Sequence, residues 1–242
     1  MIFKLMRVEL LKVRRSLALM MMFACPLMVA LLMLAVELKS KRGWSLEMFW
    51  ASHTAVWCYF MYPLYIALVT GLLNGNEHKN ATWRVMLTMP ISARQLYVAK
   101  LLLALCFIIG ANLVLVGLVS LSAFSLGQMG HVLPGVIDFS ILNRVLLISL
   151  TGLPILVVQH WVSWRVQNIV VPLALGVIAT MGITQIGQSK EWVYYPWTYV
   201  MTSIHATSAD ARVLAVQLAL VVAGGLFLVS TLWVGRRGAE FA

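Results

Sequence analysis

The stretch AKLLLALCFIIGANLVLVGLVSLSAF, Ala99–Phe124, decides the fold class. It is longer than the roughly 20 apolar residues that cross the hydrocarbon core of a bilayer as a helix. Its single fixed charge, Lys100, stands at its start. The apolar residues follow one another without the alternation expected of a membrane β-strand. The stretch therefore predicts a transmembrane α-helix, whose backbone groups are hydrogen-bonded within the segment itself.

Similar stretches lie on both sides of this one. They are Leu17–Val36, Trp50–Leu73, Ile141–Val162, Asn168–Ile186 and Ala211–Val234. The chain of 242 residues is 62% hydrophobic and 11% charged, with a mean hydropathy of +0.91. Soluble domains contain about 25% charged residues, so the composition excludes an ordinary water-soluble fold. We expect an all-α polytopic membrane protein in which residues 1–242 form one domain with six transmembrane helices.

The distribution of basic residues predicts the orientation of these helices. Six spans place both termini on one side of the membrane, and that side carries 12 of the 18 Lys and Arg residues. Because cytoplasmic segments carry the excess of basic residues, we expect both termini in the cytoplasm. The net charge of +10 is then an orientation signal, and no nucleic-acid partner is expected.

The spans offer little catalytic or ion-coupling chemistry. Their central portions contain no Asp, Glu, Lys or Arg, and the two histidines within them, His53 and His160, stand near span ends. Ion-coupled transporters usually carry ionisable residues inside their spans. The three cysteines all fall within spans, so neither a disulfide framework nor a metal cluster is expected. The chain also lacks the Gly-rich phosphate-binding motif, so ATP-driven work would require a separate subunit.

The longest expected cytoplasmic segment is residues 74–98, NGNEHKNATWRVMLTMPISARQLYV. Within it, Glu77–Leu87 predicts a short helix with Asn76 as its N-cap and an acidic residue in its first turn. The apolar side chains of Trp83, Met86 and Leu87 fall within one turn of that helix. Such a group suits a docking surface for a partner protein, and equally an interfacial helix anchored by its Trp.

A helix break and a second helix start follow in the same segment. Pro90 ends the short helix, because it disfavours helical geometry at Met89. Ser92 and Gln95 match the S-x-x-Q capping box, which predicts that the next membrane-spanning helix begins there.

The first 16 residues predict a basic amphipathic helix. Its apolar arc contains Ile2, Phe3, Met6, Leu10 and Val13, and its broadly opposite arc contains Lys4, Arg7 and Arg15. A helix of this kind normally lies in the membrane interface. It serves either as an anchor that sets the topology or as an element that passes motion from a partner to the first span.

The chain resembles a known family over essentially its whole length, and two motifs carry the resemblance most specifically. The linker E-H-K-N-A-T-W-R…L-T-M-P-I-S…Y-V-A-K, Glu77 to Lys100, is similar to that of type-2 ABC exporter permeases. The small permeases of lantibiotic immunity and bacitracin resistance are the most similar kind. The opening R-V-E-L-L-K-V-R-R, Arg7 to Arg15, resembles the connecting helix of these proteins.

The resemblance implies a permease subunit that moves an amphipathic or hydrophobic substrate, such as a peptide antibiotic, a lipid or a drug, out of a bacterial cell through its inner membrane. Two copies of a nucleotide-binding ATPase and a second permease subunit, identical or different, would complete the transporter. ATP and Mg would bind to the ATPase, and no cofactor is expected in this chain. The resemblance implies that the short helix of the linker is a coupling helix that docks on the ATPase through Glu77, His78, Trp83, Arg84, Met86, Leu87 and Pro90. It also implies an N-terminal connecting helix with the residues Arg7, Glu9, Lys12 and Arg14.

Two span faces carry weakly polar residues. They contain Tyr59, Tyr62 and Thr70 in the second span, and Gly176, Thr180 and Thr184 in the fifth. Small and hydroxylated residues at this spacing permit close packing of helices within the subunit. In the resembling family these spans line the substrate path between paired permeases, which is the alternative role.

The aromatic outer loop 187–210 is expected to lie at, or dip into, the outer headgroup layer, either as an ordinary aromatic belt or as an exit gate. Two other function classes remain as alternatives. One is a secondary transporter or channel, which the uncharged span interiors disfavour. The other is an intramembrane enzyme, for which the sequence offers neither a serine-protease motif nor an acidic cluster.

Overall fold

The protein is an all-helical bundle over the part of the chain that the computed structural model describes, residues 2–39, 45–79, 91–129, 140–187 and 189–237. Its elements are α1 Ile2–Val13, α2 Leu17–Lys39, α3 Leu46–Val56, the π-turn η1 Trp57–Met61, α4 Tyr62–Lys79, α6 Ala93–Gln128, α7 Ser140–Thr151, α8 Leu153–Arg165, α9 Val170–Ile186, the 3₁₀ turns η2 Lys190–Tyr194 and η3 Pro196–Thr198, α10 Tyr199–His205 and α11 Ala209–Arg237.

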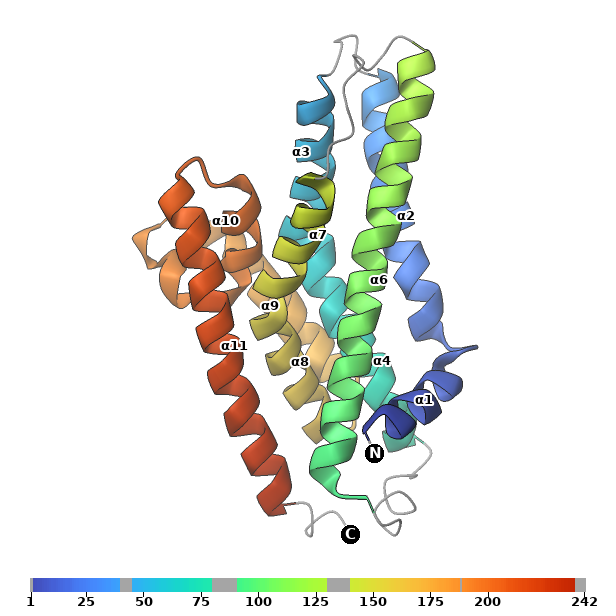
Figure 1. Ribbon diagram of the computed structural model, residues 1–242, viewed down its shortest axis with the longest axis vertical. Coiled ribbons are helices and arrows are strands. Elements are labelled where there is room, and N and C mark those ends of the chain that lie inside the picture. Colours follow the sequence, from blue (N-terminus) through green and yellow to red (C-terminus); the bar gives the residue numbers. More distant parts are fainter. Residues whose placement is uncertain (1, 40–44, 80–90, 130–139, 188, 238–242) are drawn as a thin grey trace.

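The bundle has two distinct ends (Figure 1). At one end α1 lies across the bundle, α4 and α11 end, and α6 begins. We call this the basal end. At the distal end α2 ends and α3 begins. The long helix α6 runs between the two ends and packs against α1, α2, α4, α7, α8 and α11.

Four helices are long and apolar enough to cross a membrane: Leu17–Lys39, Leu46–Gly75, Ala93–Gln128 and Ala209–Arg236. A fifth candidate is the pair α7 and α8, which is bent by 46° at a short break. Pro154 in the first turn of α8 lacks the N–H that a continuous helix would need there. The sixth expected span corresponds to α9, whose 17 residues extend about 25 Å along a helix axis. Six spans therefore stay a prediction, while four to five are supported by length and composition.

The second candidate span contains a wider turn at its centre. The helix is unbroken from Leu46 to Lys79, but η1 adopts π geometry just before Pro63. Pro63 has no N–H to donate to the preceding turn, which accounts for the change in hydrogen-bond pattern there. The side chains around this turn hold the centre of the bundle: Trp57 Nε1 donates to Asn112 Oδ1 at 2.9 Å, and the hydroxyl of Tyr62 donates to the carbonyl of Ile148 at 3.0 Å.

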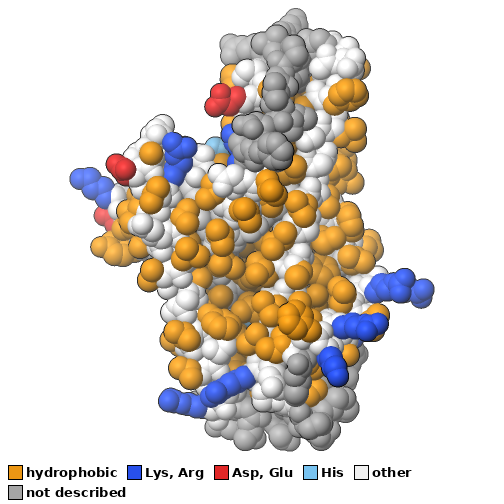
Figure 2. All heavy atoms as spheres, in the orientation of Figure 1, with side chains coloured by type: hydrophobic (Ala, Val, Ile, Leu, Met, Phe, Trp, Pro, Cys, Tyr) orange, Lys and Arg blue, Asp and Glu red, His pale blue; other side chains and the backbone are white. Residues whose placement is uncertain are grey.

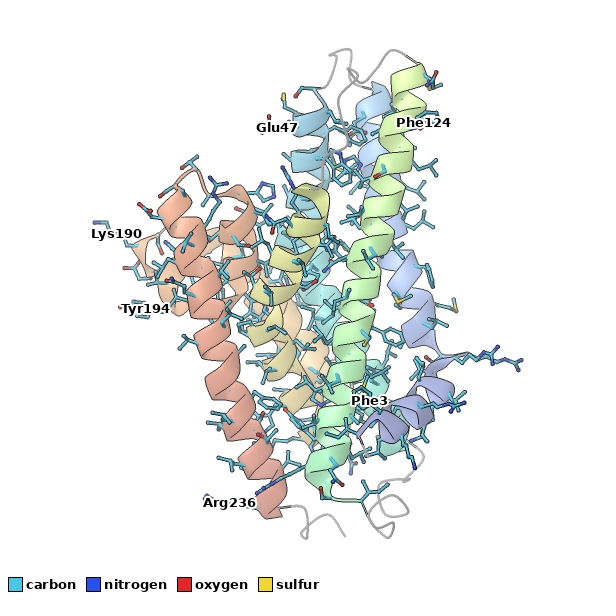
Figure 3. All side chains as sticks on the ribbon, in the orientation of Figure 1. Phe3, Glu47, Phe124, Lys190, Tyr194 and Arg236 are labelled. Atoms are coloured by element: carbon cyan, nitrogen blue, oxygen red, sulfur yellow. The ribbon has the colours of Figure 1, made fainter. Side chains whose placement is uncertain are left out.

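The aromatic segment after α9 folds against the bundle. The hydroxyl of Tyr195 donates to the carbonyl of Ala179, and Trp197 and Tyr199 are buried. Tyr194 instead points outward with 84% of its surface exposed (Figure 3). Helix α10 then packs on α7 and α11. The position of this segment in a headgroup layer stays a prediction.

Gly176 sets the distance between α9 and α4. A Cβ at this position would lie 2.6 Å from the Cβ of Ala67. We predict that Gly176→Val lowers the melting temperature of the purified protein, because overpacking of a helix contact costs about 1–3 kcal/mol. Gly117→Val is the matched control, because a Cβ added at Gly117 meets no described atom within 4 Å. Equal melting temperatures for the two variants would contradict the packing assigned to Gly176.

Candidate functional site at the basal end

A buried ion pair joins α1 to α6. Glu9 and Lys100 are 2% and 1% exposed, and Lys100 Nζ lies 2.9 Å from Glu9 Oε2. The same ammonium donates to the carbonyl of Leu73 in α4 at 2.9 Å. The other carboxylate oxygen of Glu9 accepts from Lys12 at 2.6 Å. The connecting helix is thus attached to the last part of α4 and to the first part of α6.

The surroundings of Glu9 favour its ionised form. Burial on its own raises the pKa of the Glu9 carboxyl, but the adjacent ammonium groups of Lys100 and Lys12 outweigh burial and lower this pKa below its ordinary value. An ionised carboxylate next to a buried ammonium leaves the junction without an uncompensated charge, which a site this deeply buried requires.

A second set of hydrogen bonds joins α4 to α8. Asn74 Nδ2 donates to Ser163 Oγ at 2.7 Å and lies 3.2 Å from His160 Nδ1. His160 Nε2 lies 3.2 Å from the carbonyl oxygen of Tyr97 in α6. These partners fit a neutral imidazole that accepts at Nδ1 and donates at Nε2. Three helices are therefore connected through His160, which is fully buried.

Aromatic side chains extend the junction to α11. Tyr97 packs edge to face against Trp164 with ring centroids 5.2 Å apart, and Val234 of α11 belongs to the same cluster. The guanidinium of Arg165 lies over the ring of Trp233 at 4.5 Å, within the range of a cation–π contact. We use "basal junction" for the residues Glu9, Leu73, Asn74, Tyr97, Lys100, His160 and Ser163.

The basal junction includes Asn74 and Tyr97, which lie at the two ends of the expected cytoplasmic segment 74–98. We call this segment the coupling segment. Helix α4 continues through Asn76 to Lys79, so the expectation that Asn76 caps a new helix is wrong. Backbone hydrogen bonding carries α4 about one and a half turns beyond the expected span end. The predicted capping box is confirmed, because Ser92 Oγ accepts from the Gln95 N–H and Gln95 Oε1 accepts from the Ser92 N–H.

Most of the expected docking residues lie outside the described residues. These are Trp83, Arg84, Met86, Leu87 and Pro90. Glu77 and His78 belong to the last turn of α4, but their side chains also lie outside the described part. Their docking role therefore stays a prediction.

The expected connecting helix is present as α1, but its buried face differs from the expected apolar arc. Phe3 and Leu10 of that arc are 84% and 54% exposed, whereas Val13 is buried as expected and Glu9 is 2% exposed. The physical reason is the Lys100 ammonium, which requires a counter-charge, and Glu9 is the only acidic residue of the first 16. Of the other connecting-helix residues, Arg7, Lys12 and Arg14 are exposed.

The weakly polar span faces are mostly buried within the chain. Tyr62, Thr70 and Thr180 have no exposed surface, and Gly176 packs on α4. These four residues are buried within the described chain, which agrees with packing inside the subunit, and their role in a substrate path stays a prediction. Tyr59 is half-buried and Thr184 is exposed, so these two can contact lipid or another subunit.

The buried acidic side chains are what the sequence analysis missed. Hydropathy places Glu37 outside the first span, but it lies within α2 with no exposed surface. Glu37 and Lys100 stand near helix ends, so the expectation that the central portions of the spans lack fixed charge is unchanged, but the burial of these two side chains was not expected. Glu9 was detectable, because a lysine at the start of an apolar helix calls for an acidic partner. His160 gave no such signal, since its partners come from distant parts of the chain.

Loss of the Lys100 ammonium should weaken the basal junction. We predict that Lys100→Met lowers the melting temperature strongly, because removing one partner of a buried ion pair costs about 3–5 kcal/mol. Adding Glu9→Gln should restore part of the loss. Lys12→Met is the control, since its partly exposed pair with Glu9 is worth about 1 kcal/mol at most. Because the folded chain lowers the pKa of Glu9, the ionised carboxylate should stabilise the fold at any pH above the ordinary pKa of a glutamate. This stabilisation should be lost progressively as the pH falls from that ordinary pKa through the lowered pKa of the folded chain.

Comparison with known proteins assigns the chain to a family. Curated proteins gave no match. The family model described as ABC-2 family transporter protein matches residues 5–183, which is well over half of the chain, extends from α1 into α9 and includes the whole basal junction. This chain belongs to the ABC-2 transporter family, and is a multi-pass membrane protein of the kind that forms the transmembrane component of ABC transporters.

Proposed function

We propose that this chain is the permease subunit of an ATP-driven exporter, and that a separate ATPase drives its alternating access by acting on the segment between α4 and α6. Family membership supports a transmembrane component that associates with an ATP-binding subunit. The observation that carries the coupling proposal is the basal junction. It joins the last turns of α4 and the first turns of α6 to α1 and α8, so a displacement of the segment between α4 and α6 would reach four helices at once.

The orientation proposed for the exporter places the basal end in the cytoplasm, where the ATPase would dock. On the face seen in Figure 2, basic side chains lie in both halves, whereas acidic side chains appear only in the distal half, so only the basal half carries basic side chains without acidic ones. Because cytoplasmic segments are enriched in Lys and Arg, this distribution supports the proposed orientation in a bacterial inner membrane.

The proposed substrate is amphipathic or hydrophobic, as a peptide antibiotic, lipid or drug would be. Tyr59 and Thr184 are the two expected path residues that remain at the surface of the described chain. Hydroxyl groups beside apolar residues suit a weakly polar molecule better than a free ion. The path would form against a second permease subunit, identical or different, with two ATPase subunits binding ATP and Mg beneath the pair.

The docking proposal is tested with two substitutions in the coupling segment. We predict that Trp83→Asp combined with Leu87→Asp abolishes co-purification with an ABC ATPase of the same organism, because the charges oppose burial in a docking groove. Trp83→Phe with Leu87→Met is the conservative control and should retain the ATPase. Unchanged ATPase recovery with the double Asp variant would contradict docking at this segment.

The orientation is tested by cysteine labelling of intact cells in a cysteine-free background. Arg236 and Lys190 are exposed and lie towards opposite ends of the molecule (Figure 3). A membrane-impermeant maleimide should label Lys190→Cys and leave Arg236→Cys unlabelled until the cells are opened. Labelling of both positions in intact cells would refute the proposed orientation.

A further inference from the structure

A carboxyl and an imidazole face each other at the distal end, far from the basal junction. Glu37 lies near the end of α2 and His53 lies in α3, and neither side chain has exposed surface. His53 Nδ1 is 3.6 Å from Glu37 Oε1 and 2.9 Å from the carbonyl oxygen of Phe49. The imidazole also packs on the ring of Phe49 with centroids 4.4 Å apart. The pair thus bridges two helices in apolar surroundings.

The pair carries unused hydrogen-bonding capacity. Both carboxyl oxygens of Glu37 and the Nε2 atom of His53 are buried without a hydrogen-bond partner among the residues that the structure describes. A bare carboxylate in this setting is strongly disfavoured, because it has lost its water without gaining a donor. A metal ion is a poor candidate for the missing group, since the described residues contain no cluster of three His, Cys, Asp or Glu side chains.

No other charged side chain among the described residues supplies the missing hydrogen-bond partner of the Glu37 carboxyl. On the same two helices, Lys39 and Glu47 are exposed. The part of α6 after Lys100 contains no acidic or basic side chain. His205 of α10 contacts Thr54 rather than the pair, and lies in the field of Arg144 from α7. Lys41 and Arg42 lie outside the described residues.

One proton removes the uncompensated charge of a buried carboxylate. Added to Glu37, it makes the carboxyl neutral and leaves a neutral imidazole whose Nδ1–H donates to the carbonyl of Phe49. A charge-assisted bond between an ionised pair would close to about 2.7–2.9 Å, whereas the observed separation is 3.6 Å. The geometry therefore favours a neutral Glu37 carboxyl beside a neutral imidazole over an ionised pair.

We propose that Glu37 and His53 form a proton-binding site that holds the distal ends of α2 and α3 together while it is occupied. Loss of the proton leaves a buried carboxylate between the two helices, so the helices separate until water reaches it. Separation of the helices for any other reason exposes the carboxyl and lets it release its proton to the solution at the distal end.

The test follows the protonated carboxyl by infrared difference spectroscopy on the purified full-length chain in lipid nanodiscs. The pH range is about 5 to about 10, which brackets ordinary imidazole and buried carboxyl groups. The difference spectrum of wild type against Glu37→Gln should contain the protonated-carboxyl stretching band at acidic pH and lose it at alkaline pH. Glu47→Gln, which removes the exposed carboxyl of α3, should leave that band unchanged.

A second measurement tests whether the proton holds the helices together. Spin labels at Leu38 and Met48, which are 49% and 60% exposed, stand beside Glu37 on α2 and on the first turn of α3. Their separation should increase at alkaline pH in the otherwise wild-type chain and stay short at every pH with Glu37→Gln. With His53→Phe, the carboxyl should keep its proton to a higher pH, because the imidazole that could share the proton is gone.

Two results would overturn the proposal. One is the absence of a Glu37-dependent band at every pH, which would mean that the carboxylate is ionised and paired with another group, such as Lys41 or Arg42. The other is a titrating band without a change in label separation. Neither measurement uses ATP or a partner subunit, so a negative result here leaves the proposed export function standing, and a failed ATPase-docking test leaves this site standing.

Discussion

A charged amine inside an apolar helix has to be neutralised by the protein itself, and in this bundle the amine of Lys100 imposes that requirement on other segments. Glu9 turns inward to meet it, which fixes the rotation of α1 about its own axis. The carbonyl of Leu73 accepts from it, which ties down α4 about one and a half turns before that helix ends. The result is a connection between the amphipathic helix and both flanks of the segment between α4 and α6. An apolar residue at position 100 would leave the buried Glu9 carboxylate without this ammonium and would remove the polar link from α1 through Lys100 to α4.

The helices themselves could be predicted from the sequence, because continuous apolar runs have few alternatives in a membrane. The start of α6 was predictable to the residue, since Ser92 and Gln95 satisfy each other's backbone groups locally. The limits of other helices were not. Helix α4 extends past the polar residues Asn74 and Asn76, because hydropathy changes there while helical hydrogen bonding does not. The bend between α7 and α8 follows from Pro154 together with Gly152, whose added Cβ would collide with the hydroxyl of Tyr62.

The buried polar side chains were the least predictable part. The expected apolar arc of α1 contains both Phe3 and Val13, but only Val13 is buried, and the acidic Glu9 is buried beside it. The buried face is therefore rotated from the centre of the apolar arc, because Lys100, far along the chain, pairs with Glu9. Glu37 shows the same effect: its position near the end of an apolar run suggests exposure, yet α3 folds back over it and His53 covers it. Polarity along the chain limits where helices lie, while charge partners between helices fix how they are rotated.

The two ends of the bundle treat buried charge differently, and this difference bears on how such a protein can move. At the basal end, Glu9 is ionised and held by two ammonium groups, so separating α1 from α6 would expose two charges that are already well paired. At the distal end, Glu37 makes no hydrogen bond within the described part of the chain, so α2 and α3 lose little polar interaction when they part. If a partner acts near the basal junction, as proposed, we expect the helices to stay together at the base and to separate at the opposite end. In the proposed transporter, parting of α2 and α3 at the distal end would break fewer polar contacts than parting of α1 and α6 at the base.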